Sequence, residues 1–262
     1  MKEEYRRRER QEQVQEINEN QLEGRNALTE ALRSGRTIDK VFIAAGETDR
    51  GLQLLAAQAK EAGAVVVPVD RRKLNAMSTT GAHQGVIALA AVRQYSTIDD
   101  ILQEAADRGE APLIVICDEL SDPHNLGAII RSAECAGAHG IIIPKRRSVG
   151  LTAVVAKTSA GAVEYMKVAK VTNITSAIEE LKEKGVWVFG TAAEGSIPMY
   201  QADLTIPTAI VIGSEGDGMS RLVQKSCDVT VNIPMKGRIT SLNASAAASI
   251  LLYEAVRQRL NK

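Results

Sequence analysis

Short apolar runs alternate with helical patterns from residue 112 onward, and this alternation restricts the possible folds more than any other feature of the sequence. The apolar runs predict strands at residues 113–117, 140–143, 165–169, 186–190, 208–212 and 229–233. The segments around them predict helices at 125–136, within 149–161, and at 174–184, 218–225 and 242–259. Strands and helices that alternate in this way build a mostly parallel sheet with helices on both faces. We therefore expect an α/β domain over residues 112–262.

Polar or glycine-rich turns follow several of these predicted strands. One turn is 213–218 (GSEGDG), a second is 233–235 (IPM), and a third, 241–245 (SLNAS), opens the final helix. Upstream, the segment 122–127 (DPHNLG) follows the first strand and leads to Arg131. Open α/β sheets bind ligands beyond the carboxyl ends of their strands, so these turns predict one shared site.

A smaller α/β pattern precedes this domain. It contains predicted helices near 26–33 and 51–62 and predicted strands at 41–43, 65–67 and 85–92. We expect this first domain to cover residues 21–95, followed by a linker helix over 96–111 with a Ser-Thr cap. Residues 1–20 carry dense mixed charge and almost nothing apolar, which predicts a charged, flexible arm.

Composition restricts the partners and the surroundings of the chain. Its 32 lysines and arginines balance its 32 aspartates and glutamates, so any basic face has to be local. Aromatic residues make up 3% of the chain, which argues against capturing single strands by serial stacking. The three cysteines form no C-x-x-C pair, and we expect buried free thiols and no metal site. No apolar run approaches the roughly 20 residues of a membrane helix, so we expect a cytoplasmic protein without a membrane partner.

Three common ligand-binding or catalytic signatures are missing. The only G-x-G of the chain is Gly216–Gly218, and Arg221 stands where the dinucleotide fingerprint needs its third glycine. The phosphate-binding pattern G-x-x-x-x-G-K-[ST] and the hydrolase elbow G-x-S-x-G are absent as well. What remains is a set of turns with backbone donors and acceptors and few charges. Such a site suits a neutral, adenine-bearing cofactor better than a polyphosphate.

The combined motifs resemble those of a known family. N-L-G-x-x-x-R at 125–131, G-S-E-G at 213–216 and I-P-M with S-L-N-A-S at 233–245 are similar to the three motifs of the SpoU/TrmH family of the SPOUT methyltransferases. The segments 24–32 and 83–88 resemble the ends of the L30e-like substrate-binding domain that precedes the catalytic domain in many members. The resemblance implies a parallel sheet with a deep trefoil knot, a homodimer, and S-adenosylmethionine as cofactor. RlmB-like 23S rRNA guanosine 2′-O-methyltransferases are the most similar subgroup.

The resemblance also implies roles for individual residues. Arg131 matches the arginine at the target ribose, and Asn125 and Glu215 match polar residues that hold the site. Ser241 and Asn243 match the third motif. The residues implied to bind the cofactor are Thr191, Ala192, Gly213, Ile233, Pro234, Met235 and Leu242. The residues expected to contact RNA are Arg25, Lys145, Arg146 and Arg147.

The chemistry of Arg131 favours one role over another. A guanidinium is effectively never deprotonated in proteins, so we interpret Arg131 as a stabiliser of the developing alkoxide rather than a general base. Simpler interpretations remain open at this point: a surface ion pair for Arg131, a loop-fixing carboxylate at Glu215, and a helix cap at 241–245. His124 is a further candidate base, although a histidine in a proline-containing turn is usually structural.

These motifs predict an RNA ribose 2′-O-methyltransferase that acts on a guanosine of 23S rRNA and has no DNA partner. Two alternatives stay open. One is a methyltransferase for tRNA, and the other is a non-catalytic RNA-binding factor for ribosome assembly.

Overall fold

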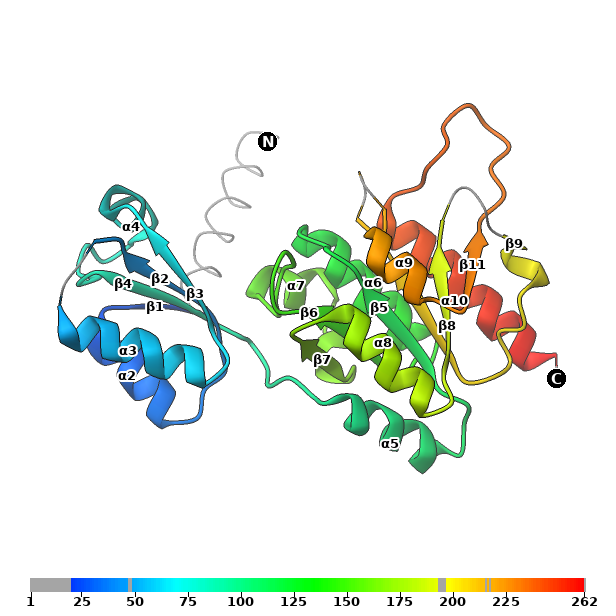
Figure 1. Cartoon of the computed structure of the whole chain (residues 1–262), viewed down its shortest axis with the longest axis horizontal. Coiled ribbons are helices and arrows are strands. Elements are labelled where there is room, and N and C mark those ends of the chain that lie inside the picture. Colours follow the sequence, from blue (N-terminus) through cyan, green and yellow to red (C-terminus); the bar gives the residue numbers. More distant parts are fainter. Residues whose placement is uncertain (1–19, 47–48, 193–196, 215, 217, 262) are drawn as a thin grey trace, which may run out of the picture. The chain divides into compact units, whose positions relative to one another are not determined.

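A computed structural model of the chain describes residues 20–46, 49–192, 197–214, 216 and 218–261 (Figure 1). The chain divides into two compact units. The first contains the described residues up to Gln94 together with Gly150–Val154, and the second contains Tyr95–Val149 and the described residues from Val155 onward. The arm predicted for residues 1–20 lies almost entirely outside the described residues.

The first unit is built on a mixed sheet. Its described strands are β1 (Gln21–Glu23), β2 (Ile38–Ala44), β3 (Val65–Val69) and β4 (Val86–Ala90), in the order β1-β4-β2-β3. Strands β2 and β3 are parallel, whereas β4 runs antiparallel to both β1 and β2. The helices are α2 (Arg25–Arg33), α3 (Arg50–Glu61) and α4 (Arg71–Met77). Neither β1 nor α4 was predicted. Strand β1 has only three residues, too few to show an alternating pattern, and α4 buries a single side chain, Leu74, so it has no apolar stripe.

Two separate apolar clusters lie on the two faces of this sheet. Helices α2 and α3 supply Leu28 and Leu52 to the larger cluster, which packs on Val41 and Val86. On the opposite face a smaller cluster gathers around Leu74 of α4. One face of the sheet is therefore covered by two long helices and the other by one short helix.

The second unit contains a parallel sheet, as the alternation of strands and helices predicts. Its described strands have the order β7-β6-β5-β10-β8-β11-β9, and every neighbouring pair is parallel. They are β5 (Leu113–Cys117), β6 (Gly140–Pro144), β7 (Val168–Val171), β8 (Trp187–Thr191), β9 (Ile197–Pro198), β10 (Thr208–Ile212) and β11 (Val229–Asn232). The central strands β5, β6 and β10 are buried along their whole length. Strand β9 has two residues, too few to show a sequence period.

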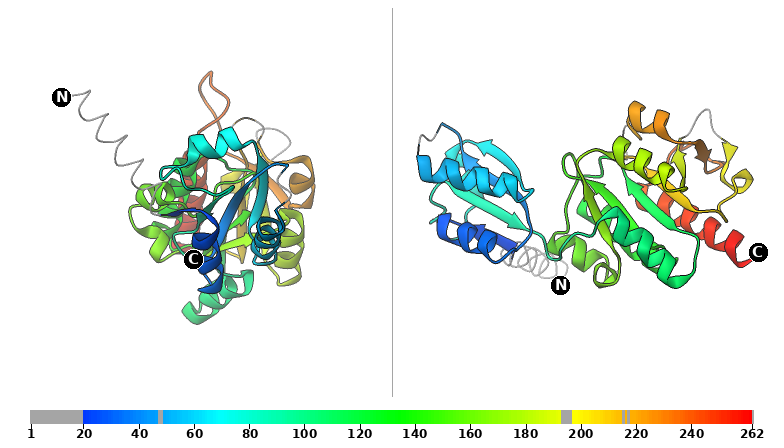
Figure 2. Two further views of the ribbon diagram at one scale, coloured as in Figure 1. Left: turned by 90° about the vertical axis from the view of Figure 1, so that its left-hand side faces the viewer. Right: turned by 60° about the horizontal axis from the view of Figure 1, so that its bottom comes forward.

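Helices cover both faces of this second sheet. The helices are α5 (Ile98–Arg108), α6 (Pro123–Cys135), α7 (Ala153–Thr158), α8 (Ile174–Glu183), α9 (Arg221–Ser226) and α10 (Ala244–Leu260), with short 3-10 turns at Ala162–Glu164 and Met199–Gln201. Helices α5 and α8 share one apolar cluster, whereas α6 and α10 pack together on the other face (Figure 1 and Figure 2). Two helices begin later than expected, α9 after Ser220 and α10 after Asn243, because these residues occupy the N-cap positions.

Helix α5 belongs structurally to the second unit. Thr97 and Asp100 form a capping box at its start. Ile98 and Ile101 enter the same apolar cluster as α8. A Cβ atom at Gly140 would lie 2.4 Å from Cγ1 of Ile101, so the glycine at the start of β6 makes room for this helix. Residues expected to form a linker therefore contribute to the core of the second unit.

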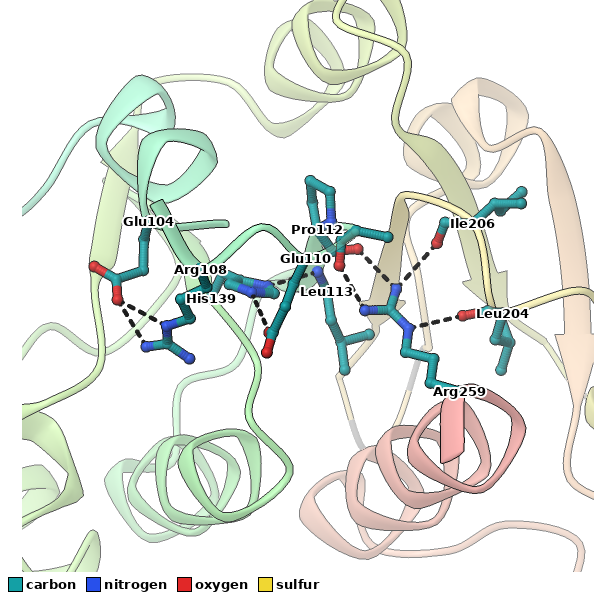
Figure 3. Close-up of polar contacts among 10 residues, drawn as sticks. Glu104, Arg108, Glu110, Pro112, Leu113, His139, Leu204, Ile206 and Arg259 are labelled. Atoms are coloured by element: carbon teal, nitrogen blue, oxygen red, sulfur yellow. Dashed lines mark hydrogen bonds and ion pairs between the residues drawn. The ribbon is translucent and has the colours of Figure 1, made fainter. Parts of the chain in front are cut away.

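Arg259, near the end of α10, is anchored at the amino-terminal edge of this sheet. Its guanidinium donates hydrogen bonds to the carbonyl oxygens of Ala111, Pro112, Leu204 and Ile206 at 2.6–3.1 Å (Figure 3). Burial lowers the pKa of Arg259 below its ordinary value. One side chain thus joins the last helix to the segments that lead into β5 and β10.

His139 lies at the same edge, directly before β6, and is 1% exposed. Its Nδ1 accepts a hydrogen bond from the backbone N–H of Leu113 at 3.0 Å, and its Nε2 lies 3.0 Å from Oε2 of Glu110 (Figure 3). Burial lowers the pKa of His139 below its ordinary value of 6.5, and the Glu110 carboxylate opposes this shift only in part. The folded chain therefore favours the neutral imidazole.

This burial predicts a loss of stability in mild acid. Below pH 6.5 the unfolded chain binds a proton at His139 more readily than the folded chain does, so the free energy of unfolding decreases as pH falls through this window. We expect His139→Gln, which retains an acceptor and a donor, to flatten this part of the profile. Urea unfolding at several pH values measures the effect, with His124→Gln at an exposed position in the first turn of α6 as the matched control. Equal slopes for wild type and His139→Gln would contradict the assignment.

Candidate functional site

The three glycine-rich or polar turns come together around one cavity of about 980 Å³ at the carboxyl ends of β8, β10 and β11. The cavity is lined by Thr191, Ala192, Ser214, Gly216, Gly218, Met219, Gln224, Val231, Asn232, Ile233, Pro234, Met235, Gly237, Thr240, Ser241, Leu242, Ala247 and Leu251. None of these described lining residues carries a formal charge. The volume falls within the range of small-molecule sites, which is roughly 300–1,000 Å³.

The turn after β10 closes on itself. The backbone N–H groups of Ser214 and Gly218 each donate to the other residue's carbonyl, at 3.0 and 3.1 Å. Gly218 has a φ of +67°, a conformation that favours glycine. A Cβ atom at Gly213 would lie 2.2 Å from the carbonyl carbon of Gly218, so the turn closes only with glycine at 213. Glu215, a predicted site residue within this turn, lies outside the described residues.

The first and third motifs meet through two asparagines. Asn243 caps α10 because its Oδ1 accepts from the backbone N–H groups of Ser245 and Ala246, at 2.9 and 3.3 Å. Its Nδ2 donates to Oδ1 of Asn125 at 2.9 Å, and Asn125 is 4% exposed on the first turns of α6. The cap interpretation of the third motif is thus correct for Asn243. The same side chain also fixes the start of α10 against α6.

Arg131 lies further along α6, on its exposed surface, and does not line the cavity. Within the ranges that the structure describes, it makes no hydrogen bond and no ion pair. The surface ion pair considered for Arg131 is therefore not formed with any described residue. One residue on, the Ser249 hydroxyl donates to the Oγ of Ser132 at 2.8 Å and holds α10 against this part of α6.

Two cavity residues expose apolar surface. Met235 is 38% and Leu242 37% exposed, and both line the cavity. Ile239, in the segment between them, is 73% exposed. Exposed apolar side chains beside a cavity indicate a surface that a ligand or a second chain covers.

The basic residues predicted to contact RNA lie in different surroundings. Arg146 is exposed in the turn after β6, where Lys145 is half-buried. Arg147 donates to Oε1 of Glu119 at 2.9 Å, and both residues have positive φ values, 56° and 58°. In the first unit, Arg25 donates to Oδ2 of Asp49 at 2.8 Å, which holds the pKa of that carboxyl below its ordinary value. The cations of Arg25 and Arg147 are therefore partly neutralised, whereas Arg146 is more available.

Asp118 connects two parts of the site and is absent from the site residues that the motifs predict. It is 4% exposed at the end of β5, and its Oδ2 accepts from the backbone N–H of Ser220 at 2.7 Å. Its own N–H donates to the carbonyl of Ile212. Both ends of the 213–219 turn are thereby tied to β5. The only sequence signal is an acid directly after an apolar strand.

The Asp118 tie can be tested by substitution. Asp118→Ala leaves the N–H of Ser220 without its acceptor, and a hydrogen bond to a charged group contributes about 1.5–3 kcal/mol. We expect the free energy of unfolding to fall by about that amount in urea titrations. Asp118→Asn keeps an acceptor oxygen and should lose much less. Equal losses for both variants would show that the charge, and not the acceptor, is what matters.

Two further kinds of site can be assessed in the described part of the chain. There, no three or more histidine, cysteine, aspartate or glutamate side chains form a group that could hold a metal ion. No described helix has both the length and the apolar character needed to cross a membrane. The expectation of buried thiols is correct for Cys117, whose burial raises its pKa to about 12, but Cys227 is half-buried and Cys135 is exposed.

Family models match both units of the chain. Residues 112–253 match the SpoU rRNA Methylase family, and residues 21–96 match the RNA 2′-O ribose methyltransferase substrate binding family. A putative TrmH family tRNA/rRNA methyltransferase of Bacillus subtilis, YacO, is 48% identical over 236 residues. That match covers 90% of this chain and 94% of the relative.

Solved structures agree with these matches. The SpoU methyltransferase AviRb from Streptomyces viridochromogenes, in complex with AdoMet, has a TM-score of 0.62 at 25% identity, and the match covers 95% of this chain and 99% of that one. An AdoMet-bound rRNA methyltransferase from Sinorhizobium meliloti has a TM-score of 0.57 at 26% identity and covers 90% and 86%. The α/β fold class inferred from the sequence, with a parallel sheet in the second unit, is confirmed. The chain belongs to the SpoU rRNA Methylase family of RNA methyltransferases.

Proposed function

We propose that this chain is an S-adenosylmethionine-dependent RNA ribose 2′-O-methyltransferase that modifies a guanosine of 23S rRNA. The observation that carries the proposal is the cavity, where the motif turns meet and the described lining has no formal charge. Phosphate groups are usually bound by basic side chains or by helix N-termini. S-adenosylmethionine has no phosphate, so a site whose described lining residues carry no formal charge suits it.

The cofactor supplies a methyl group on a positively charged sulfur. We assign its binding to Thr191, Ala192, Gly213, Ile233, Pro234, Met235 and Leu242, all of which line the cavity except Gly213, whose role is to let the turn close. Methyl transfer requires the 2′-oxygen to lie about 3–3.5 Å from the reacting carbon, so the protein mainly has to orient the ribose. Asn125 and Asn243 serve this purpose by fixing α6 against the start of α10.

Arg131 has to reach a cavity that it does not line within its own chain. We propose a homodimer in which Arg131 of one copy approaches the cavity of the other. Helix α10 supports this arrangement because it exposes Ile250 and Tyr253, at 37% and 51%, next to the helix that carries Arg131. We also propose that the second unit contains the deep trefoil knot that the family resemblance implies.

The choice of rRNA over tRNA rests on the extent of the structural matches. The rRNA methyltransferase from Sinorhizobium meliloti covers 90% of this chain, first unit included. The TrmH/SpoU tRNA modifying enzyme from A. aeolicus covers 58%. An rRNA substrate therefore accounts better for a chain with two units.

Calorimetry and methylation mapping test this function directly. We expect the full chain to bind S-adenosylmethionine and to place a 2′-O-methyl group on unmodified 23S rRNA. Methylation of tRNA alone would replace the rRNA substrate with the tRNA alternative. If the protein binds RNA but not S-adenosylmethionine, the non-catalytic assembly factor is the better description.

A further inference from the structure

The first unit has a partly exposed sheet face that carries an aromatic side chain on an inner strand. Residue pairing places Leu89, Lys40 and Val65 in one row across β4, β2 and β3, and Ile87, Phe42 and Val67 in the next. Only Ile87 of these six is buried, and the other five are half-buried. The small cluster around Leu74 also contains Ala44, Val69 and Ile87, and Phe42 and Val67 pack against it. Among the described residues, α4 thus covers one end of this face, whereas α2 and α3 pack on the opposite face (Figure 1).

Phe42 is unusual both as an aromatic residue in this unit and as one on an inner strand. It is the only phenylalanine, tyrosine or tryptophan between residues 20 and 94. It stands on β2, an inner strand of the sheet, and not at an edge. The buried packing of this unit is otherwise formed by aliphatic side chains.

Two lysines lie over the Phe42 ring. The Nζ atoms of Lys40 and Lys73 are each 5.9 Å from the ring centroid, within the distance of a cation–π contact. Lys40 comes from β2 and Lys73 from the first turn of α4, beside the exposed Arg72. Glu23 of β1, which pairs with Ile87 in the row of Phe42, accepts hydrogen bonds from Ser78, Thr79 and Thr80. At the ring itself, two cations lie within contact distance.

We propose that Phe42 is a stacking platform for one unpaired base of the RNA substrate, with Lys40 and Lys73 contacting the flanking phosphates. Every base has a π-face, and aromatic side chains between basic residues are how proteins bind single-stranded RNA. A single stacking platform agrees with the low aromatic content of the chain. Few aromatic side chains argue against stacking several bases in series, but one side chain is enough to stack one base. The proposal rests on the proposed function, because it assumes that the substrate is RNA. It places RNA on the sheet face, in addition to the predicted contact at Arg25.

A fluorescent reporter tests the stack in the full-length protein. Phe42→Trp combined with Trp187→Phe leaves one tryptophan in the chain, at the platform. We expect saturable quenching by a single-stranded RNA of about ten nucleotides. Absence of quenching under conditions where the same RNA binds would overturn the proposal. So would quenching that appears only after residues 1–19 are deleted, because the arm would then be the occupant of this face.

Substitutions give a second, independent measurement. Phe42→Leu keeps an apolar side chain but loses the ring, and we expect about tenfold weaker binding of the single strand, with recovery in Phe42→Tyr. Lys73→Gln should flatten the logarithmic salt dependence of binding by about 0.7, whereas Lys60→Gln on α3 is the matched control. An unchanged affinity for Phe42→Leu or an unchanged slope for Lys73→Gln would contradict the platform.

The platform and the proposed function fail in different ways. If methyl transfer to RNA is measured but the reporter is never quenched, only the platform is wrong. Quenching by RNA without any methyl transfer would instead leave the platform standing and reject the proposed enzyme activity.

Discussion

Replacing Arg131 by alanine is expected to lower the turnover of RNA methylation by about 10²–10³-fold while S-adenosylmethionine still binds. Removing one group that stabilises a developing oxyanion has an effect of this size in other enzymes. Arg131 does not line the cavity of its own chain and has no partner within the described residues, so we expect the variant to fold and to retain cofactor binding. Single-turnover methylation and calorimetry with the cofactor measure the two effects separately.

Arg131→Lys distinguishes the possible roles of this residue. A lysine has a lower pKa than an arginine and a different geometry. If Arg131 stabilises the alkoxide, the lysine variant loses most of the turnover and the acidic limb of its pH profile stays in place. Near-normal turnover with a shifted acidic limb would instead identify position 131 as the general base. Arg146→Lys, at another exposed arginine, is the control for a general effect of the substitution.

Gly213→Ala is expected to have the second large effect, on both cofactor binding and stability. The added methyl group would lie 2.2–2.6 Å from backbone atoms of Gly218 and Met219, and backbone atoms are unable to turn away as a side chain does. The 213–218 turn would have to open, which distorts one wall of the cavity. Overpacking of this kind costs about 1–3 kcal/mol.

The same turn provides a matched control for this prediction. At Gly216 an added Cβ atom meets nothing within 4 Å, so Gly216→Ala should change the free energy of unfolding by less than about 0.5 kcal/mol. Thermal unfolding and calorimetry with S-adenosylmethionine measure both variants. If the two alanine variants behave alike, the close approach of Gly213 and Gly218 is not what shapes the cavity.

The sequence predicts the part of the site that is formed by turns at the ends of strands. Apolar runs locate the strands, parallel strands end at one edge, and the polar turns therefore have to meet. The cavity lining confirms this for the turns after β10 and β11 and for the segment that opens α10, whereas no residue of the 122–127 segment lines the cavity. The pairing of Asn125 with Asn243 was not predicted, because it joins residues 118 positions apart and depends on how α6 packs against α10.

Other features leave little trace in the sequence. Strand β1 forms by pairing with β4. Its three residues are too few to show the alternation of apolar and polar side chains that would predict a strand. The tie from Asp118 to Ser220 and the ion pair of Arg25 with Asp49 are long-range contacts of ordinary surface residue types. Arg131 differs again. Sequence motifs select it, but its distance from the cavity of its own chain becomes evident only in the structure.

Helix α10 is held at both of its ends by contacts to different parts of the second unit. Asn243 fixes its start against α6 beside the cavity, and the guanidinium of Arg259 secures its other end to the segments that lead into β5 and β10. The helix therefore links the cavity to the opposite edge of the sheet, and loss of either contact would leave it held at one end only.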